Sequence, residues 1–500
     1  MKTNLLEKIE ARLPQKMATV VQEIRENEQD PEKMKLREYV SFACGHLYHG
    51  SIRHMIEGYR PAFYMSTGMD ADRAGLLSSL QILYDSVSDP LVATFIDTRR
   101  ATPYRRFTPF LPKLVPVLAT FSIVMFTAPS FLEQPMAMLA WLFMTYAVWE
   151  TVFTFSNVSF DAIGTVMSGD LRERTLYTTI GNIGRQASGM VPGFIPVALE
   201  ILTRAPEGEA AIMSETNFFT LAAAVFAIIG GIAGLQTKHL KERLTSPPKE
   251  GSVISRIIQN FRLFFRNKHL LLLWSCEIPH VISRAAAPAS LQFYVHSMQN
   301  AAMQSLQWTI AGIPQFLAHS LAPFFLKRYR PSRIIIACTM ANGISLLIMF
   351  VIGRIVGYTG WMGIANVMIF ASIGWVPSGI AGIAMRMLQL NTFDYVAAKT
   401  GQRAEATSLM MFNMMSKWLW ALAALLGGFA LAYVGFQSGA AEQTQATRDG
   451  LFAIFALLPA VGNLLGPLPL FFYKLEGKEF DIRMAELGAV QQEKQAIEIE

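Results

Sequence analysis

The chain has 500 residues, of which 52% are hydrophobic and 16% are charged, and its formal net charge is +6. Soluble proteins carry charge on about a quarter of their residues, so this composition excludes an ordinary soluble enzyme. The positive charge does not indicate nucleic-acid binding, because most Lys and Arg residues lie in the tails and in alternate loops between long apolar stretches. The sequence therefore predicts an integral membrane protein.

Apolar stretches long enough to cross a bilayer recur along the whole chain. A membrane-spanning helix needs about 20 mostly apolar residues, and on this criterion we predict an all-α membrane protein with twelve transmembrane helices. The predicted spans are residues 40–66, 73–97, 109–128, 133–160, 177–203, 215–236, 269–297, 304–327, 334–357, 360–388, 404–434 and 450–473.

A long basic segment with two adjacent prolines divides these spans into two groups of six. Lys and Arg are concentrated in the tails and after even-numbered spans, which places both termini in the cytoplasm. The polar start of the chain lacks the apolar core of a signal peptide. We therefore expect a multi-pass protein of the cytoplasmic (inner) membrane with a cytoplasmic N-terminal tail at 1–38, an N-terminal six-helix half at 39–236, a cytoplasmic linker at 237–268, a C-terminal six-helix half at 269–474 and a cytoplasmic C-terminal tail at 475–500.

The first predicted span carries a polar stripe. His46, His49, Arg53, Glu57 and Arg60 follow one another at intervals of three or four residues, so they lie on one face of a helix. Ionisable side chains at membrane depth face the bundle interior or a water-filled cavity. The stripe indicates either a substrate site or a structural network of ion pairs.

The second span contains two carboxylates four residues apart, Asp85 and Asp89, with Ser88 on the same face. Carboxylates at this depth need a compensating positive charge. The simplest source is a bound cation, either Na⁺ on hard oxygen ligands or a proton shared by the pair. We expect no other metal ion and no cofactor.

A charged loop follows this span on the predicted cytoplasmic side. We expect its residues to form salt bridges that gate the cytoplasmic ends of the helices, or simply to set the membrane topology. The gating candidates are Asp97, Arg99, Arg100 and Arg106.

The two halves repeat part of one pattern. His280 and Arg284 in the seventh span match His49 and Arg53 at the same separation. Parallel repeats of six spans are typical of the major facilitator superfamily, whose substrate site lies between the halves. The segment 319–323 in the eighth span lacks the aspartates of its first-half counterpart, so a cation site there is not expected.

These motifs resemble the glycoside–pentoside–hexuronide:cation symporter family of the major facilitator superfamily, to which the melibiose carrier belongs. The segment Asp85–Pro90 matches the family pattern Asp-Ala-Ile-Asn-Asp-Pro without a gap, with Ser88 in place of Asn. A second match keeps the family's separations around the eleventh span, at Asp394, Tyr395, Arg403, Glu405 and Lys417.

The resemblance implies a major facilitator fold and cation-coupled symport by alternating access. It implies that Thr154 joins Asp85, Ser88 and Asp89 as a cation ligand and that Lys417 lies near both sites. Lys417 also has a purely structural interpretation, as a counter-ion to an aspartate of the second span. Where the family's sugar carriers hold sugar hydroxyls with aspartates of the first and fourth spans, this chain has Leu47 and Asn157.

We therefore expect a monomeric secondary active transporter, not an enzyme, that takes up a sugar or glycoside with H⁺ or Na⁺. The missing aspartates and the inward-facing basic side chains favour an anionic, uronide-like substrate. The residues expected to contact substrate are His49, Arg53, Asn157, Asp161, His280, Arg284 and Lys417.

Two alternatives stay open. The first is a symporter of the same superfamily for lysolipids or other amphiphiles, which needs an apolar cleft open to the membrane. The second is a membrane receptor or assembly factor that transports nothing, which does not need Asp85, Asp89 and Lys417 together. The sequence leaves open the substrate's identity, the choice between Na⁺ and H⁺, and whether Arg185 in the fifth span reaches the substrate.

Overall fold

The computed structural model describes residues 33–98, 107–108, 110–132, 134–204, 211–244, 261–262, 264–400, 405–440, 442–477 and 479–486. Within these ranges the secondary structure is helical, and no strand occurs among them. The chain divides into two compact units. The first comprises residues 1–59, 91–192 and 219–250, and the second comprises residues 60–90, 193–218 and 251–500. Two long helices, α3 (Leu36–Ser66) and α4 (Ala71–Thr98), contribute to both units.

The first unit is built around α3, α6 and α7. His49 of α3 contacts Ser156 of α6, and Arg53 lies over Phe153, so these two helices run antiparallel. A Cβ atom on Gly184 of α7 would lie 2.2 Å from a backbone oxygen of α3, so only glycine permits this approach. The helices of this unit are α3 (Leu36–Ser66), α4 (Ala71–Thr98), α5 (Leu111–Val124), α6 (Pro135–Val166), α7 (Leu171–Met190), α9 (Glu215–Gly234) and η2 (Leu235–His239), of which α3, α4 and α9 lie here in part.

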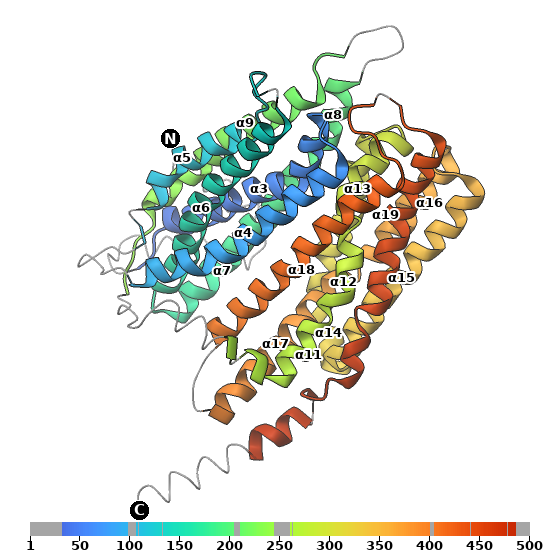
Figure 1. The fold of residues 1–500 in the computed structure, drawn as a ribbon. Helices are drawn as coiled ribbons and strands as arrows, with labels where there is room; N and C mark the ends of the chain where they lie inside the picture. The colour runs from blue at the N-terminus through green and yellow to red at the C-terminus, as the bar shows by residue number, and fades with distance from the viewer. Residues whose placement is uncertain are drawn as a thin grey trace, which may run out of the picture. The chain divides into compact units, whose positions relative to one another are not determined.

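The second unit contains the remaining helices together with parts of α3, α4 and α9. Figure 1 shows α15, α16 and α19 side by side, and an apolar cluster that includes Phe293, Phe452 and Met349 fills the space among them. Its helices are α8 (Ile195–Thr203), α11 (Lys268–Ser275), α12 (Glu277–Arg284), α13 (Ala287–Gln292), η3 (Phe293–Ser297), α14 (Ala302–Arg328), α15 (Pro331–Val356), α16 (Trp361–Trp375), α17 (Ser378–Thr400), α18 (Glu405–Tyr433), α19 (Gln445–Leu465) and η4 (Leu468–Phe472).

Seven helical stretches of the described residues are long and apolar enough to cross a membrane. They correspond to the fourth, sixth and eighth to twelfth predicted spans. They are Pro135–Val166, Glu215–His239, Ala302–Arg328, Pro331–Val356, Trp361–Val396, Met411–Tyr433 and Gln445–Phe472.

The five other predicted spans do not meet this criterion of length and hydropathy, and the physical reason differs among them. The helices α3 and α4 have 31 and 28 residues, enough to cross a bilayer, but their ionisable side chains lower their hydropathy. The apolar helix α5 has only 14 residues. The fifth and seventh spans are divided into shorter pieces. The total of twelve therefore stays a prediction, as do the boundaries of the six-helix halves.

A glutamate carboxylate that accepts hydrogen bonds from the backbone occurs twice, just before α5 and at the start of α15. The Glu242 carboxylate accepts hydrogen bonds from the backbone N–H groups of Phe107 and Thr108 and from the Thr108 hydroxyl, each at 2.7 Å, just before α5. The Glu476 carboxylate accepts hydrogen bonds from the backbone N–H of Ser332 at 3.0 Å and from its hydroxyl at 2.5 Å, at the start of α15. Glu476 thus satisfies a backbone donor that α15 leaves unpaired at its N-terminus, whereas Glu242 holds the turn that precedes α5.

Candidate cation and substrate sites

The helices α4 and α18 pack closely within the second unit. A Cβ atom on Gly75 would lie 2.7 Å from the Cα atom of Gly428, so the two backbones touch where side chains are absent. Further along, the indole N–H of Trp418 donates to the Ser86 hydroxyl at 3.0 Å. These two contacts make the helices antiparallel and fix their register. The register places Lys417 opposite the aspartates of α4.

Lys417 bridges both aspartates. Its ammonium nitrogen lies 2.7 Å from Oδ1 of Asp85 and 2.5 Å from Oδ2 of Asp89. Oxygens of the two carboxylates lie within 4.8 Å of each other. The side chains of Asp85 and Lys417 are 7% and 11% exposed, whereas that of Asp89 is 39% exposed. Asp85 and Lys417 are therefore enclosed by protein, whereas part of the Asp89 side chain reaches the protein surface.

The charges in this cluster are unequal. Two ionised carboxylates and one ammonium leave a formal charge of −1, so one further monovalent cation would balance it. Hydrogen bonds between charged groups are about twice as strong as neutral ones. A cation entering the cluster must therefore compete with Lys417 for the same oxygens. The Ser88 hydroxyl donates to the backbone oxygen of Asp85 at 3.2 Å, so its proton is held by its own helix.

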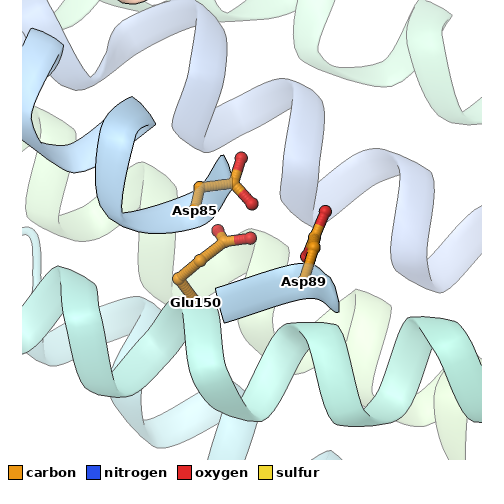
Figure 2. Close-up of side chains that lie close together, drawn as sticks. All are labelled: Asp85, Asp89 and Glu150. Carbon is orange, nitrogen blue, oxygen red and sulfur yellow. The ribbon is translucent and has the colours of Figure 1, made fainter. Parts of the chain in front are cut away.

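The predicted ligand Thr154 lies in the first unit, on α6. Its hydroxyl donates to the Glu150 carboxylate at 3.4 Å, and both side chains are buried. Figure 2 shows Asp85 and Asp89 on α4, and it also shows Glu150 on α6. Glu150 was not among the predicted site residues. Its sequence signal was a carboxylate inside a predicted span, one helical turn before Thr154.

Part of the polar stripe of α3 is held by the protein itself. Nε2 of His49 lies 2.8 Å from the Ser156 hydroxyl, and Nδ1 lies 2.8 Å from the backbone oxygen of Gly45. The ring is buried and stacks on Phe160, with 4.9 Å between centroids. Both ring nitrogens are thus engaged in packing α3 against α6.

The next turn of this stripe is more open. Arg53 forms a salt bridge with Glu57 at 2.6 Å, and these side chains are 31% and 49% exposed. On α6, the Asn157 amide donates to the Asp161 carboxylate at 3.1 Å, and Asp161 is exposed. These four side chains form the polar, accessible face of the first unit. Arg185 of α7 is also exposed and donates to Asn182 at 2.9 Å.

His280 and Arg284, the counterparts of His49 and Arg53 in the second unit, lie on α12. Arg284 forms a salt bridge with Glu277 at 2.5 Å. Its guanidinium carbon lies 4.9 Å from the ring centroid of Trp420 on α18. His280 packs against α19 near Gly466, where a Cβ atom would lie 2.6 Å from the imidazole.

The predicted gating residues fall largely outside the described part of the chain. Arg99, Arg100 and Arg106 lie beyond it, and the backbone of Asp97 belongs to α4 without a described side chain. Their role stays a prediction.

Comparison with known protein families decides the class. The family model described as MFS/sugar transport protein matches residues 41–477, which is most of the chain. The chain belongs to this family. Its fold is accordingly that of a major facilitator transporter, a multi-pass, all-α membrane protein.

Several relatives of this MFS/sugar transport protein match over nearly their whole length. The "Uncharacterized symporter YjmB" of Bacillus subtilis is 24% identical over 459 residues, covering 90% of this chain and 94% of the relative. The "Putative sulfoquinovose importer" of Escherichia coli is 24% identical over 480 residues, covering 93% and 96%. The "Isoprimeverose transporter" of Lactiplantibacillus pentosus is 21% identical over 428 residues, covering 84% and 85%.

Solved structures confirm the fold of the MFS/sugar transport protein. An inward-facing bacterial homologue of the human lysosomal transporter Spinster superposes with a TM-score of 0.56 at 14% identity, covering 89% of this chain and 99% of that one. The nucleoside transporter NupG superposes with a TM-score of 0.57 at 12% identity, covering 88% and 100%.

Proposed function

We propose that this protein is a secondary active transporter that couples the uptake of a sugar or glycoside to the entry of Na⁺ or H⁺. The observation that carries the proposal is the bridge from Lys417 to Asp85 and Asp89. Two carboxylates and an ammonium inside a membrane protein are expensive to bury, which makes a functional site the expected reason for them. The names of the relatives, two of them sugar transporters and one a symporter, support this assignment.

Lys417 supplies a mechanism for the coupling. With no cation bound, its ammonium occupies the carboxylate oxygens of α4. A bound Na⁺ or proton displaces it and thereby alters the contact between α4 and α18. A cation that changes the balance between two conformations also changes the affinity for substrate, and the effect is reciprocal. Substrate therefore binds more tightly to the cation-loaded protein.

The charges beside the proposed substrate residues favour an uncharged sugar. An anionic substrate was expected because Arg53 and Arg284 point inward. Each of these arginines now has a glutamate partner on its own helix, at 2.6 Å to Glu57 and at 2.5 Å to Glu277. The positive charge of each of these two arginines is thus balanced by a glutamate of its own helix. We propose a monomeric carrier in the cytoplasmic membrane with both termini in the cytoplasm.

Transport into proteoliposomes tests the proposed function. A Na⁺ gradient and a pH gradient are imposed separately, and accumulation is measured for a panel of neutral glycosides, uronides and lysolipids. We expect one gradient to drive accumulation of a glycoside, and Asp85→Asn or Asp89→Asn to abolish it. The control is Asp70→Asn, since Asp70 is 66% exposed and lies outside the cluster. Accumulation that survives in both cluster variants would refute the coupling, and uptake of lysolipids alone would favour the amphiphile carrier.

A further inference from the structure

Trp420, Arg284 and Glu277 form an ordered group within the second unit. Trp420 lies in the middle of the apolar stretch Met411–Tyr433, and its side chain is 37% exposed. The guanidinium of Arg284 lies over its ring at 4.9 Å, and the Glu277 carboxylate holds that guanidinium at 2.5 Å. The side chains of Arg284 and Glu277 are 37% and 19% exposed. We call this group the indole platform.

The salt bridge within the indole platform argues that the platform faces water and not lipid. A salt bridge in contact with hydrocarbon is costly, and ionisable side chains at membrane depth face a bundle interior or an aqueous cavity. Because Arg284 is partly exposed and lies on Trp420, the exposed edge of the indole shares that environment. Trp420 follows Lys417 by three residues, so the two side chains lie on the same side of α18, about one turn apart.

The chemistry of the platform matches that of a sugar ring. One face of a pyranose presents C–H groups and packs on an aromatic ring, while its hydroxyl groups both donate and accept hydrogen bonds. The indole offers the apolar surface. Arg284 offers donors in a planar array and Glu277 offers acceptors. A binding site of this kind combines apolar walls with a few placed polar groups.

We propose that Trp420 is the stacking surface for the substrate's sugar ring and that Glu277 sets selectivity for uncharged sugars by neutralising Arg284. This inference rests on the proposed function and specifies its substrate class. Rejection of uronides follows from the same arrangement, since a second carboxylate at Arg284 would face the charge of Glu277. Glu277 is a positioning and selectivity residue, and Trp420 contacts the substrate. The nearby Lys417 links occupation of the platform to the cation cluster.

Binding measurements on purified protein in nanodiscs test both roles. Trp420→Leu is expected to weaken binding of a neutral glycoside roughly tenfold or more, since it removes the aromatic surface. Trp420→Phe keeps an aromatic ring and is expected to restore most of the affinity. Cation binding, measured without sugar, is expected to be unchanged in both variants. Quenching of tryptophan fluorescence by the glycoside should be lost in Trp420→Phe and kept in Trp361→Phe, whose indole is 76% exposed at the start of α16.

Glu277→Gln tests selectivity. It removes one charge with little change of shape and leaves Arg284 without its salt bridge. We expect the ratio of uronide to neutral-glycoside affinity to rise about tenfold to a hundredfold, because a charged hydrogen-bond partner is exchanged. Glu57→Gln, which removes the negative charge beside Arg53 in the first unit, is the matched comparison and is expected to have the smaller effect.

The outcomes separate this inference from the proposed function. Wild-type protein that transports a glycoside, together with Trp420→Leu and Glu277→Gln variants that bind it with unchanged affinity and preference, would overturn the platform alone. Wild-type protein that binds and accumulates no glycoside would overturn both. A thermal unfolding midpoint measured for each variant identifies any loss caused by misfolding, and Trp420→Phe then supplies the decisive comparison.

Discussion

At the residue scale, Lys417 is an internal occupant of the cation cluster. Replacing it by glutamine removes the ammonium and leaves Asp85 and Asp89 to repel each other. We expect Lys417→Gln to bind Na⁺ or H⁺ about tenfold or more tightly, because its competitor contributes hydrogen bonds of about 1.5–3 kcal/mol. Accumulation of substrate is expected to fall, because release of the cation becomes slow. Isothermal titration of the cation measures the first effect.

The control for this change is Lys113→Gln, which removes an exposed ammonium from α5. It should leave cation affinity unaltered. Weaker cation binding in Lys417→Gln would contradict an occupant role and would show that the ammonium only supports the fold.

Some of these residue contacts were predictable and some were not. The spacing of Asp85 and Asp89 predicted a shared face, and a link from Lys417 to an aspartate of the second span was one interpretation of the sequence. Glu57 follows Arg53 by one turn and was an evident partner. Glu277 precedes Arg284 by about two turns, and nothing in the sequence indicates that Arg284 pairs with Glu277 and does not simply face solvent. The contact depends on side-chain rotamers that spacing does not specify.

At the element scale, the approach of α4 to α18 depends on glycine. A Cβ on Gly428 would lie 2.5 Å from the backbone oxygen of Ala71, closer than real Cβ contacts. We expect Gly428→Ala to push the helices apart, to lower the stability of the folded protein by about 1–3 kcal/mol, and to impair the bridge at Lys417. Thermal unfolding in detergent and Na⁺- or H⁺-driven uptake measure the two effects.

Gly382 provides the matched comparison. It lies within α17, where a Cβ atom would meet nothing within 4 Å. Gly382→Ala is expected to be neutral or stabilising by up to about 1 kcal/mol, since alanine favours the helix. Equal effects of the two substitutions would mean that helix propensity, and not the contact with α4, decides the result.

Helix boundaries were the feature of the fold that the sequence predicted least well. The fifth predicted span is divided into α7, η1 (Val191–Phe194) and α8, with Pro192 in the break and Pro196 at the start of α8. The seventh predicted span is divided likewise, and Pro288 is the second residue of α13. Proline cannot donate the helical hydrogen bond and starts new helices readily. Hydropathy alone misses such breaks, because it is averaged over a window of about 19 residues, which is longer than the break itself.

At the scale of the whole molecule, the internal repeat extends to two glutamates, Glu242 and Glu476, which hold the backbone just before α5 and at the start of α15. The sequence suggested a repeat only from His49, Arg53, His280 and Arg284, and the two glutamate contacts are an independent instance of it. We expect Glu242→Gln and Glu476→Gln to lower the stability of the folded protein by similar amounts, about 1–3 kcal/mol each, because a charged acceptor is lost from buried donors.

Thermal unfolding of the two variants, with Glu479→Gln as the control, checks this expectation. Glu479 is 41% exposed and its salt bridge with Arg483 lies on the surface, where such pairs contribute about 0–1 kcal/mol. A large loss of stability in only one of the two variants would mean that the two glutamates do not contribute equally to the stability of the folded protein.

The inequality of charge at Lys417, Asp85 and Asp89 has an electrical consequence. A carrier without cargo moves one negative charge through the membrane field, and a carrier that has taken up a monovalent ion moves none. A full elementary charge corresponds to about 2.3 kcal/mol per 100 mV. An inside-negative voltage should therefore accelerate the return of the vacant carrier to the outer face, whereas the inward step of the loaded carrier should depend little on voltage. Transient currents should appear when the coupling ion is absent and vanish when it is saturating.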